Sequence, residues 1–76
     1  MTIVDLLNEI DAIIEAKRGT TAMDDELAGL AGWDSMAAIS FIAMADEKLG
    51  LALNASQLAS CVTVGDLAKL CAVEAV

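Results

Sequence analysis

The sequence predicts an all-α fold: a small bundle of three main helices and one short helix, with a long loop between the first two helices. Apolar residues recur every three to four positions near the N-terminus and in the middle of the chain, as on one face of an amphipathic helix. No segment alternates apolar and polar residues as a half-buried strand does. The 76 residues are enough for one domain, 1–76, with a single shared core.

The first helix is expected to start after Thr2. Thr2 and Asp5 resemble a capping box, in which each side chain binds the backbone N–H of the other residue. Residues 17–19 (Lys-Arg-Gly) supply positive charge near the helix end and then a stop signal. The stripe expected in the core consists of Ile3, Leu6, Leu7, Ile10, Ile13 and Ile14. The face expected in solvent carries Asp5, Asn8, Glu9, Asp11 and Glu15.

Residues 19–34 show no sustained periodicity and predict the long loop. A loop of this length in a small domain is unusual and often functional. Its apolar residues Met23, Leu27 and Leu30 are spaced to attach it to the core. The acidic run at 24–26 is interpreted as a solvated part of the loop, with a divalent-ion site as the alternative.

The second helix should begin at Asp34 or Ser35 and end near Leu49, with Gly50 as its C-terminal cap. The face expected in the core carries Ala38, Phe41, Ala45 and Leu49. An adjacent apolar stripe carries Met36, Ile39 and Ile42. Both faces cannot easily be buried in so small a domain. We therefore expect part of the second stripe to be exposed beside Ser35, where a partner can cover it. A wider core is the alternative.

The last third of the chain predicts a short helix followed by the last of the main helices. Asn54 can cap a helix of one to two turns that extends through Ser60. Thr63 then caps the final helix, and Asp66 in its first turn suits the helix dipole.

Composition argues against several classes of function. A net charge of −8 with four Lys and Arg residues is unsuited to nucleic acid and to anionic membranes. The same charge suits partners with basic patches. The chain has no His and no Tyr, so it lacks the usual general base near neutral pH, and no zinc-ligand spacing is present. We therefore expect a binding or carrying protein without a metal site, and not an enzyme.

The same sequence features indicate a compartment. The longest uncharged run, 49–65, contains too many polar residues for a membrane-spanning helix. The N-terminus carries Asp5 and Glu9 without a basic flank, so it does not resemble a signal peptide. We expect a monomeric protein of the cytoplasm. Cys61 and Cys71 are interpreted as small buried hydrophobes, because neither a Cys-x-x-Cys spacing nor a His partner accompanies them.

The most informative segment is 32–36, Gly-Trp-Asp-Ser-Met. It places Ser35 at the N-terminus of an apolar helix and at the end of the long loop. A helix N-terminus offers unpaired N–H groups and partial positive charge, which suit a phosphate group. A phosphodiester on Ser35 would be well placed there. The simpler interpretation is that Asp34 or Ser35 only caps the helix.

Several motifs together resemble the acyl carrier proteins. Asp34-Ser35-Met36 is similar to their Asp-Ser-Leu signature, with Met in place of Leu, and Trp33 precedes it as in freestanding carriers. Residues 46–50 (Asp-Glu-Lys-Leu-Gly) match the charged end of the family's second helix. Residues 63–67 (Thr-Val-Gly-Asp-Leu) match the motif that opens its last helix. The resemblance extends over nearly the whole chain.

This resemblance implies a carrier that catalyses nothing itself. Ser35 would be the hydroxyl to which a phosphopantetheinyl transferase attaches 4′-phosphopantetheine from coenzyme A. Asp34 would help the transferase complex to position its metal ion. An acyl group would be held as a thioester on the arm and passed between acyl-transferring or acyl-modifying enzymes. The residues expected to contact partners are Trp33, Met36, Ile39, Ile42, Asp46 and Glu47.

One departure from the family concerns the cargo and the pathway. Early in the second helix, where fatty-acid carriers have acidic residues, this chain has Ala37, Ala38 and Ser40. This favours a specialised lipid, polyketide or related pathway whose enzymes recognise apolar contacts, over housekeeping fatty-acid synthesis. The small residues Ala38, Ala45 and Ala59 suggest space for a cargo within the bundle.

Two alternatives remain at this point. The first is an aminoacyl or peptidyl carrier, because D-alanyl carriers have similar Trp-Asp-Ser-Leu motifs. The second is an unmodified interaction module that binds a partner through the second helix. A hydrolase that uses Ser35 is disfavoured, because the chain has no His and no Gly-x-Ser-x-Gly turn.

Overall fold

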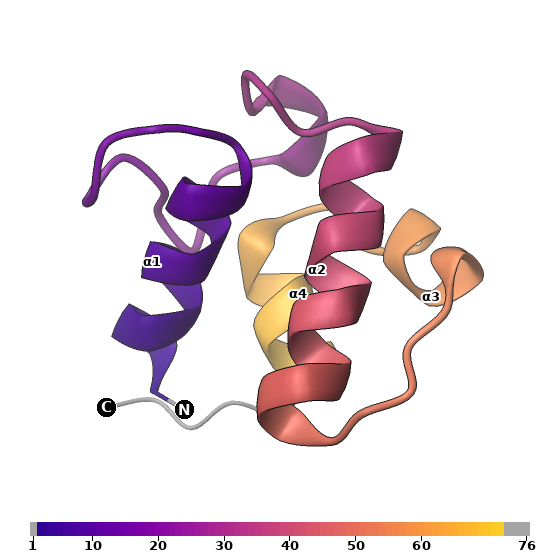
Figure 1. The fold of residues 1–76 in the computed structure, drawn as a ribbon. Helices are drawn as coiled ribbons and strands as arrows, with labels where there is room; N and C mark the ends of the chain where they lie inside the picture. Colours follow the sequence, from indigo (N-terminus) through magenta and orange to yellow (C-terminus); the bar gives the residue numbers. More distant parts are fainter. Residues whose placement is uncertain (1, 73–76) are drawn as a thin grey trace.

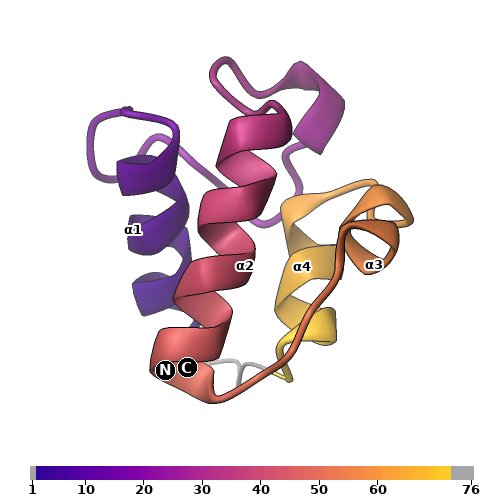
Figure 2. The same ribbon diagram turned by 45° about the vertical axis from the view of Figure 1, so that its right-hand side comes forward.

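The computed structural model describes residues 2–72. This part of the chain forms the predicted all-α bundle, with helices α1 (Ile3–Ile13), α2 (Ser35–Leu49), α3 (Ala55–Ala59) and α4 (Val64–Leu70). In Figures 1 and 2, α2 runs antiparallel to α1, and α3 lies on the other side of α2. Helix α4 lies behind α2 in Figure 1 and between α2 and α3 in Figure 2. The long loop between α1 and α2 crosses one end of the bundle and contains a single 3₁₀ turn, Leu27–Gly29.

All four helices contribute side chains to the core. Leu6 and Ile10 of α1, Phe41 of α2, and Val64 and Leu67 of α4 are fully buried. Leu58 of α3 joins the same cluster, and Met23 and Leu30 of the loop pack against it. Burial of one such side chain contributes about 1.5–3 kcal/mol, so these contacts are the main source of stability.

Local side-chain caps determine where the helices begin. Three helices start with a capping box, and the pairs are Thr2–Asp5, Asn54–Gln57 and Thr63–Asp66. These starts confirm the predicted caps. Hydrogen bonds from the backbone N–H groups of Val62 and Thr63 hold the pKa of Asp66 below its usual value.

The end of α1 differs from the prediction. The helix ends at Ile13, so Lys17, Arg18 and Gly19 lie beyond it and leave no basic residue in its last turn. Glu15 adopts a left-handed conformation with φ of 59°, which turns the chain out of the helix. The expected stop signal therefore lies inside the loop.

Asp11 is buried, contrary to the prediction. It was expected on the solvent face, but it is only 2% exposed. Its carboxylate accepts hydrogen bonds from the backbone N–H groups of Gly19 and Thr21, both at 2.9 Å, and from the Thr21 hydroxyl. Burial alone would raise the pKa of Asp11, but these donors outweigh it and hold the pKa below its usual value. The buried carboxylate thus anchors the first half of the loop.

Backbone hydrogen bonds to the start of α4 hold the second half of the loop. Leu27 N–H donates to the Val62 carbonyl at 2.9 Å, and Gly65 N–H donates to the Met23 carbonyl at 2.8 Å. Leu27 is buried, as the spacing of apolar residues predicted. The loop is therefore attached at both halves and delivers the chain to the start of α2 along a defined path.

The buried face of α2 is rotated from the predicted one. Phe41 and Ala45 are buried as expected, but Ala37 and Met44 are buried with them, whereas Ala38 and Leu49 are only half-buried. The reason is that α1 and α3 both contact α2, so its core face is set by two neighbours on different sides. Periodicity along α2 alone could not identify them.

Candidate functional site

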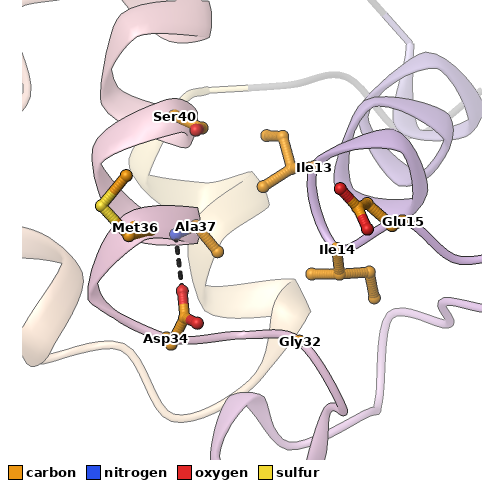
Figure 3. Close-up of a pocket in the computed structure, with 8 residues that line it drawn as sticks. All are labelled: Ile13, Ile14, Glu15, Gly32, Asp34, Met36, Ala37 and Ser40. Carbon is orange, nitrogen blue, oxygen red and sulfur yellow. Dashed lines mark hydrogen bonds between the residues drawn. The ribbon is translucent and has the colours of Figure 1, made fainter.

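The start of α2 is held by Asp34. Its carboxylate accepts a hydrogen bond from the backbone N–H of Ala37 at 2.9 Å (Figure 3). Its carbonyl accepts one from the backbone N–H of Ala38 at 3.0 Å. Asp34 is therefore the N-cap, and Ser35 is the first residue of the helix. Sequence reasoning had left the capping role open between these two residues. Because Asp34 performs it, the exposed Ser35 is not needed as the cap.

The surroundings of Ser35 fit a covalently attached phosphodiester. In an α-helix the N–H groups of the first residues have no intrahelical acceptor, which here leaves those of Ser35 and Met36 available. The aligned peptide dipoles add partial positive charge at this end of the 15-residue helix. An anionic group on the Ser35 oxygen would lie close to these donors, while the exposed side chain leaves room for a long substituent.

The chain that leads into Ser35 is closely packed. Gly32 has a φ of +89°, and a Cβ atom there would lie 2.8 Å from the carbonyl oxygen of Ile14. Trp33, the next residue, packs edge-to-face on Phe41 with ring centroids 6.1 Å apart. These contacts fix the backbone immediately before the helix, so the position of Ser35 does not depend on a free loop.

An apolar groove lies between α2 and α3 and reaches Ser35. We call it the α2–α3 groove; its volume is about 410 Å³. It is lined by Trp33, Asp34, Ser35, Ala38, Ile39, Ile42, Ala55, Leu58 and Ala59. Two of the three small residues expected to leave space, Ala38 and Ala59, line this groove, whereas Ala45 is buried in the core.

A second concavity lies on the other side of the helix start, between α1 and α2. This α1–α2 hollow has a volume of about 370 Å³. Figure 3 shows Ile13, Ile14 and Glu15 from the end of α1 on one side of it and Ala37 of α2 on the other. Met36 and Ser40 of α2 also line it. Gly32 and Asp34 complete its lining. The first turns of α2 therefore stand between two concavities.

The predicted partner residues divide into two groups in space. Met36 and Ile39 are 70% and 60% exposed beside Ser35, and Ile42 is half-buried in the α2–α3 groove. This confirms that part of the second apolar stripe is exposed. Asp46 and Glu47 are exposed near the far end of α2. Trp33 is half-buried, because it both packs on Phe41 and lines the groove.

Two parts of this site were not found from the sequence. Ala55 and Leu58 of α3 line the groove, and Glu15 lines the hollow. Ala55 and Leu58 lie about twenty positions after Ser35, so periodicity within α2 carried no signal for them. Glu15 lies just beyond α1, at the unexpected left-handed turn, and the sequence carried no signal that it would line the hollow.

Other candidate sites carry little support within residues 2–72. No cluster of metal-ligating side chains occurs there, including at the acidic run 24–26. Cys61 and Cys71 are both free, and burial raises the pKa of each thiol above its usual value, which disfavours a reactive thiolate. No helix in this part of the chain is long and apolar enough to span a membrane.

Comparison with known protein families supports the site geometry. Residues 2–71 match the family described as phosphopantetheine attachment site. No curated protein and no solved structure gave a significant match. Domains of the matched family are carriers that interact with phosphopantetheinyl transferases and acyl enzymes, and they are typically not catalytic. The match covers nearly the whole chain, which therefore belongs to the phosphopantetheine attachment family and has 4′-phosphopantetheine as its prosthetic group.

Proposed function

We propose that the chain is an acyl carrier protein whose 4′-phosphopantetheine arm is attached to Ser35. The arm's thiol holds an acyl intermediate as a thioester and presents it to partner enzymes of a specialised lipid, polyketide or related pathway. The chain acts as one carrier domain over residues 1–76 and catalyses none of these steps.

One observation carries the assignment to Ser35. It is the exposed first residue of a long helix whose N-cap role is already taken by Asp34. Its hydroxyl is therefore free to be a nucleophile when a transferase supplies a base. The oxygen attacks a diphosphate phosphorus of coenzyme A, and a phosphodiester forms. The adenosine-containing phosphate leaves, and the hydroxyl proton passes to the transferase.

Asp34 has two proposed roles in this scheme. Its carboxylate caps α2 and so orients Ser35, and it also helps the transferase complex to position a metal ion. These roles are compatible, because the hydrogen bond to Ala37 involves one carboxylate oxygen, Oδ1. The second oxygen can accept a further contact from a bound partner.

The α2–α3 groove is the proposed location of the cargo next to the arm. It begins at Ser35 and is lined mainly by apolar side chains, including Ile39, Ile42 and Leu58. An apolar acyl chain would lose contact with water there. A charged amino group would gain no ionic partner, because the only charged lining residue, Asp34, lies at the mouth beside Ser35. This favours acyl cargo over aminoacyl cargo.

The proposed partner surface includes both groups of exposed residues on α2. Its apolar part consists of Trp33, Met36, Ile39 and Ile42, and its acidic part consists of Asp46 and Glu47. The first group surrounds Ser35, where every partner enzyme must reach the arm.

The test is the intact mass of the protein after incubation with coenzyme A, magnesium and a broad-specificity phosphopantetheinyl transferase. Ser35→Ala is compared with Ser56→Ala, which removes another exposed serine from the first turn of a helix. We expect the parent and Ser56→Ala to gain one phosphopantetheine and Ser35→Ala to gain none.

Two results would contradict the proposal. A mass gain in Ser35→Ala would place the arm elsewhere. No gain in the parent, while the transferase modifies a control carrier, would favour the unmodified interaction module. If modification succeeds, loading the arm with a fatty acyl or an aminoacyl group and comparing protection of the thioester from hydrolysis distinguishes the two cargo classes.

A further inference from the structure

Asp11 is a buried charged group that the proposed arm chemistry does not use. Its Oδ2 accepts a hydrogen bond from Gly19 N–H and its Oδ1 accepts one from Thr21 N–H, both at 2.9 Å. The Thr21 hydroxyl also donates to Oδ1. Within residues 2–72 no lysine or arginine forms an ion pair with Asp11. A buried charge must be compensated, so here the backbone and hydroxyl donors take the place of a counter-charge.

These hydrogen bonds hold one piece of the loop against α1. Burial raises the pKa of Asp11, but the donors outweigh burial and keep the pKa below its usual value, so the group is an anion at neutral pH. Hydrogen bonds to an ionised acceptor are stronger than neutral ones. The carbonyl of Asp11 also accepts a hydrogen bond from Ala16 N–H at 2.8 Å. Residues 16–21, which we call the anchored turn, are thus bound to Asp11 at both ends.

The anchored turn lies beside the residues that lead into α2. Thr20, inside the turn, lines a hollow of about 520 Å³ together with Leu30 and Ala31. Ile14 directly precedes the turn region, and a Cβ atom at Gly32 would lie only 2.8 Å from the Ile14 carbonyl oxygen. The segment 30–34 is therefore supported by the first half of the loop on one side, immediately before the helix starts.

We propose that Asp11 is a positioning residue for attachment of the arm: its carboxylate holds the anchored turn, and through it the segment 30–34, so that Ser35 keeps one orientation. This inference rests on the proposed attachment at Ser35. Asp11 acts through backbone contacts and not on the reacting oxygen. A transferase must bring the coenzyme A phosphorus to that oxygen, and a small displacement of a reacting group lowers the rate strongly. Without the anion, the turn opens and the segment 30–34 loses its support.

Limited trypsin digestion tests the first step, because Lys17 and Arg18 lie exposed in the anchored turn. Asp11→Asn keeps the size of the side chain but removes the charge and one acceptor oxygen. Cleavage after residues 17 and 18, followed by mass, should become about tenfold faster, since trypsin cuts the opened turn. Ile10→Val is the matched control: it removes one methylene from a fully buried neighbour and none of these hydrogen bonds, so this cleavage should change less than about threefold.

Hydrogen exchange follows the effect towards α2. Trp33 N–H donates to the Leu30 carbonyl at 3.2 Å, just before the helix. Cys71 N–H donates to the Leu67 carbonyl at 3.0 Å, at the end of α4, and serves as the internal reference. In Asp11→Asn, exchange at Trp33 should rise about fivefold or more relative to Cys71, whereas a general loss of stability would raise both.

The rate of arm attachment completes the test. With the transferase and coenzyme A described above, Asp11→Asn should lower kcat/KM about fivefold or more, and Ile10→Val should leave it within about twofold. Thr21→Val removes only the hydroxyl donor and should cause a smaller loss. Thr21→Ser keeps the hydroxyl and should restore the kcat/KM of the parent.

Unchanged cleavage of the turn, unchanged exchange at Trp33, or an unchanged kcat/KM in Asp11→Asn would each overturn the inference. If circular dichroism shows that Asp11→Asn does not fold, the two Thr21 variants decide instead, and equal exchange at Trp33 in both overturns it. Digestion and exchange use the unmodified protein. Failure of the parent to be modified therefore contradicts the proposed function, and the two failures are distinguishable.

Discussion

The two ends of α2 are built in opposite ways. Each has a glycine in the left-handed region: Gly32 just before the helix with φ of +89°, and Gly50 as its C-cap with φ of +66°. At Gly32 the chain passes so close to Ile14 that a side chain has no room, whereas nothing lies within 4 Å of a Cβ atom at Gly50. The first end is thus packed backbone against backbone, and the second is open.

The side chains at the two ends differ in the opposite sense, because they are free at the packed end and paired at the open end. Beside the tightly packed end, Ser35, Met36 and Ile39 are exposed and free of charged neighbours on α2. At the open end, Lys48 of α2 forms an ion pair with Glu9 of α1. The comparison indicates that a fixed backbone with free side chains occurs at the end of α2 where we propose that the arm is attached. The charged end contributes a surface contact between helices.

The largest expected effect tests the difference between the two glycines. Gly32→Ala combines a left-handed alanine with a clash against the Ile14 carbonyl, and it should lower the free energy of unfolding by about 3 kcal/mol. Gly50→Ala meets only the conformational cost and should lose about 1 kcal/mol. Urea unfolding followed by circular dichroism measures both. Equal losses would show that the close approach at Gly32 does not constrain the fold.

An intermediate effect separates the two proposed roles of Asp34. Asp34→Ala removes the N-cap of α2 and should cost about 1 kcal/mol of stability. Asp34→Asn keeps an oxygen that accepts from Ala37 N–H, so its unfolding free energy should stay near that of the parent. If Asp34 also assists the transferase, Asp34→Asn should be modified more slowly than the parent at equal stability. Unchanged modification of Asp34→Asn would limit Asp34 to the cap.

The smallest expected loss of stability is at the Gly50 end of α2. Lys48→Met removes the exposed ion pair with Glu9 and should lower the melting temperature only slightly, less than Asp34→Ala does. The hydrogen bond from Lys48 to Glu9 raises the pKa of Lys48 above its usual value, so this lysine is charged at neutral pH. The difference from the parent should vanish in about 0.5 M NaCl. A drop in melting temperature as large as that of Asp34→Ala, or one that persists in salt, would show that the ion pair stabilises its end of α2 as much as the cap stabilises the other.

Local chemistry explains why so much of the fold was predictable. Each helix start depends on a polar side chain and a backbone N–H three residues later, as in Thr63 and Asp66. Such pairs are visible in a short stretch of sequence, and so is the C-cap glycine of α2. The motif around Ser35 was likewise readable, because all its parts are adjacent in the chain.

Burial was less predictable, because it depends on partners that are distant in sequence. Asp11 fits the polar face of α1 by position, but donors from Gly19 and Thr21 make its burial possible. Ala37 and Met44 are buried because α2 has neighbours on more than one side. The α2–α3 groove needs residues from both helices, so neither segment alone predicts it.

The sequence by itself determined the all-α class, the helix starts and the identity of the candidate serine, since these depend on contacts between near neighbours in the chain. Tertiary structure alone decided where α1 ends and which face of α2 is covered. It also decided that Ser35 lies between two concavities, with Asp34 rather than Ser35 capping the helix. The physical reason is that burial and concavity are set by the packing of several segments, whereas a cap is set by one turn of backbone.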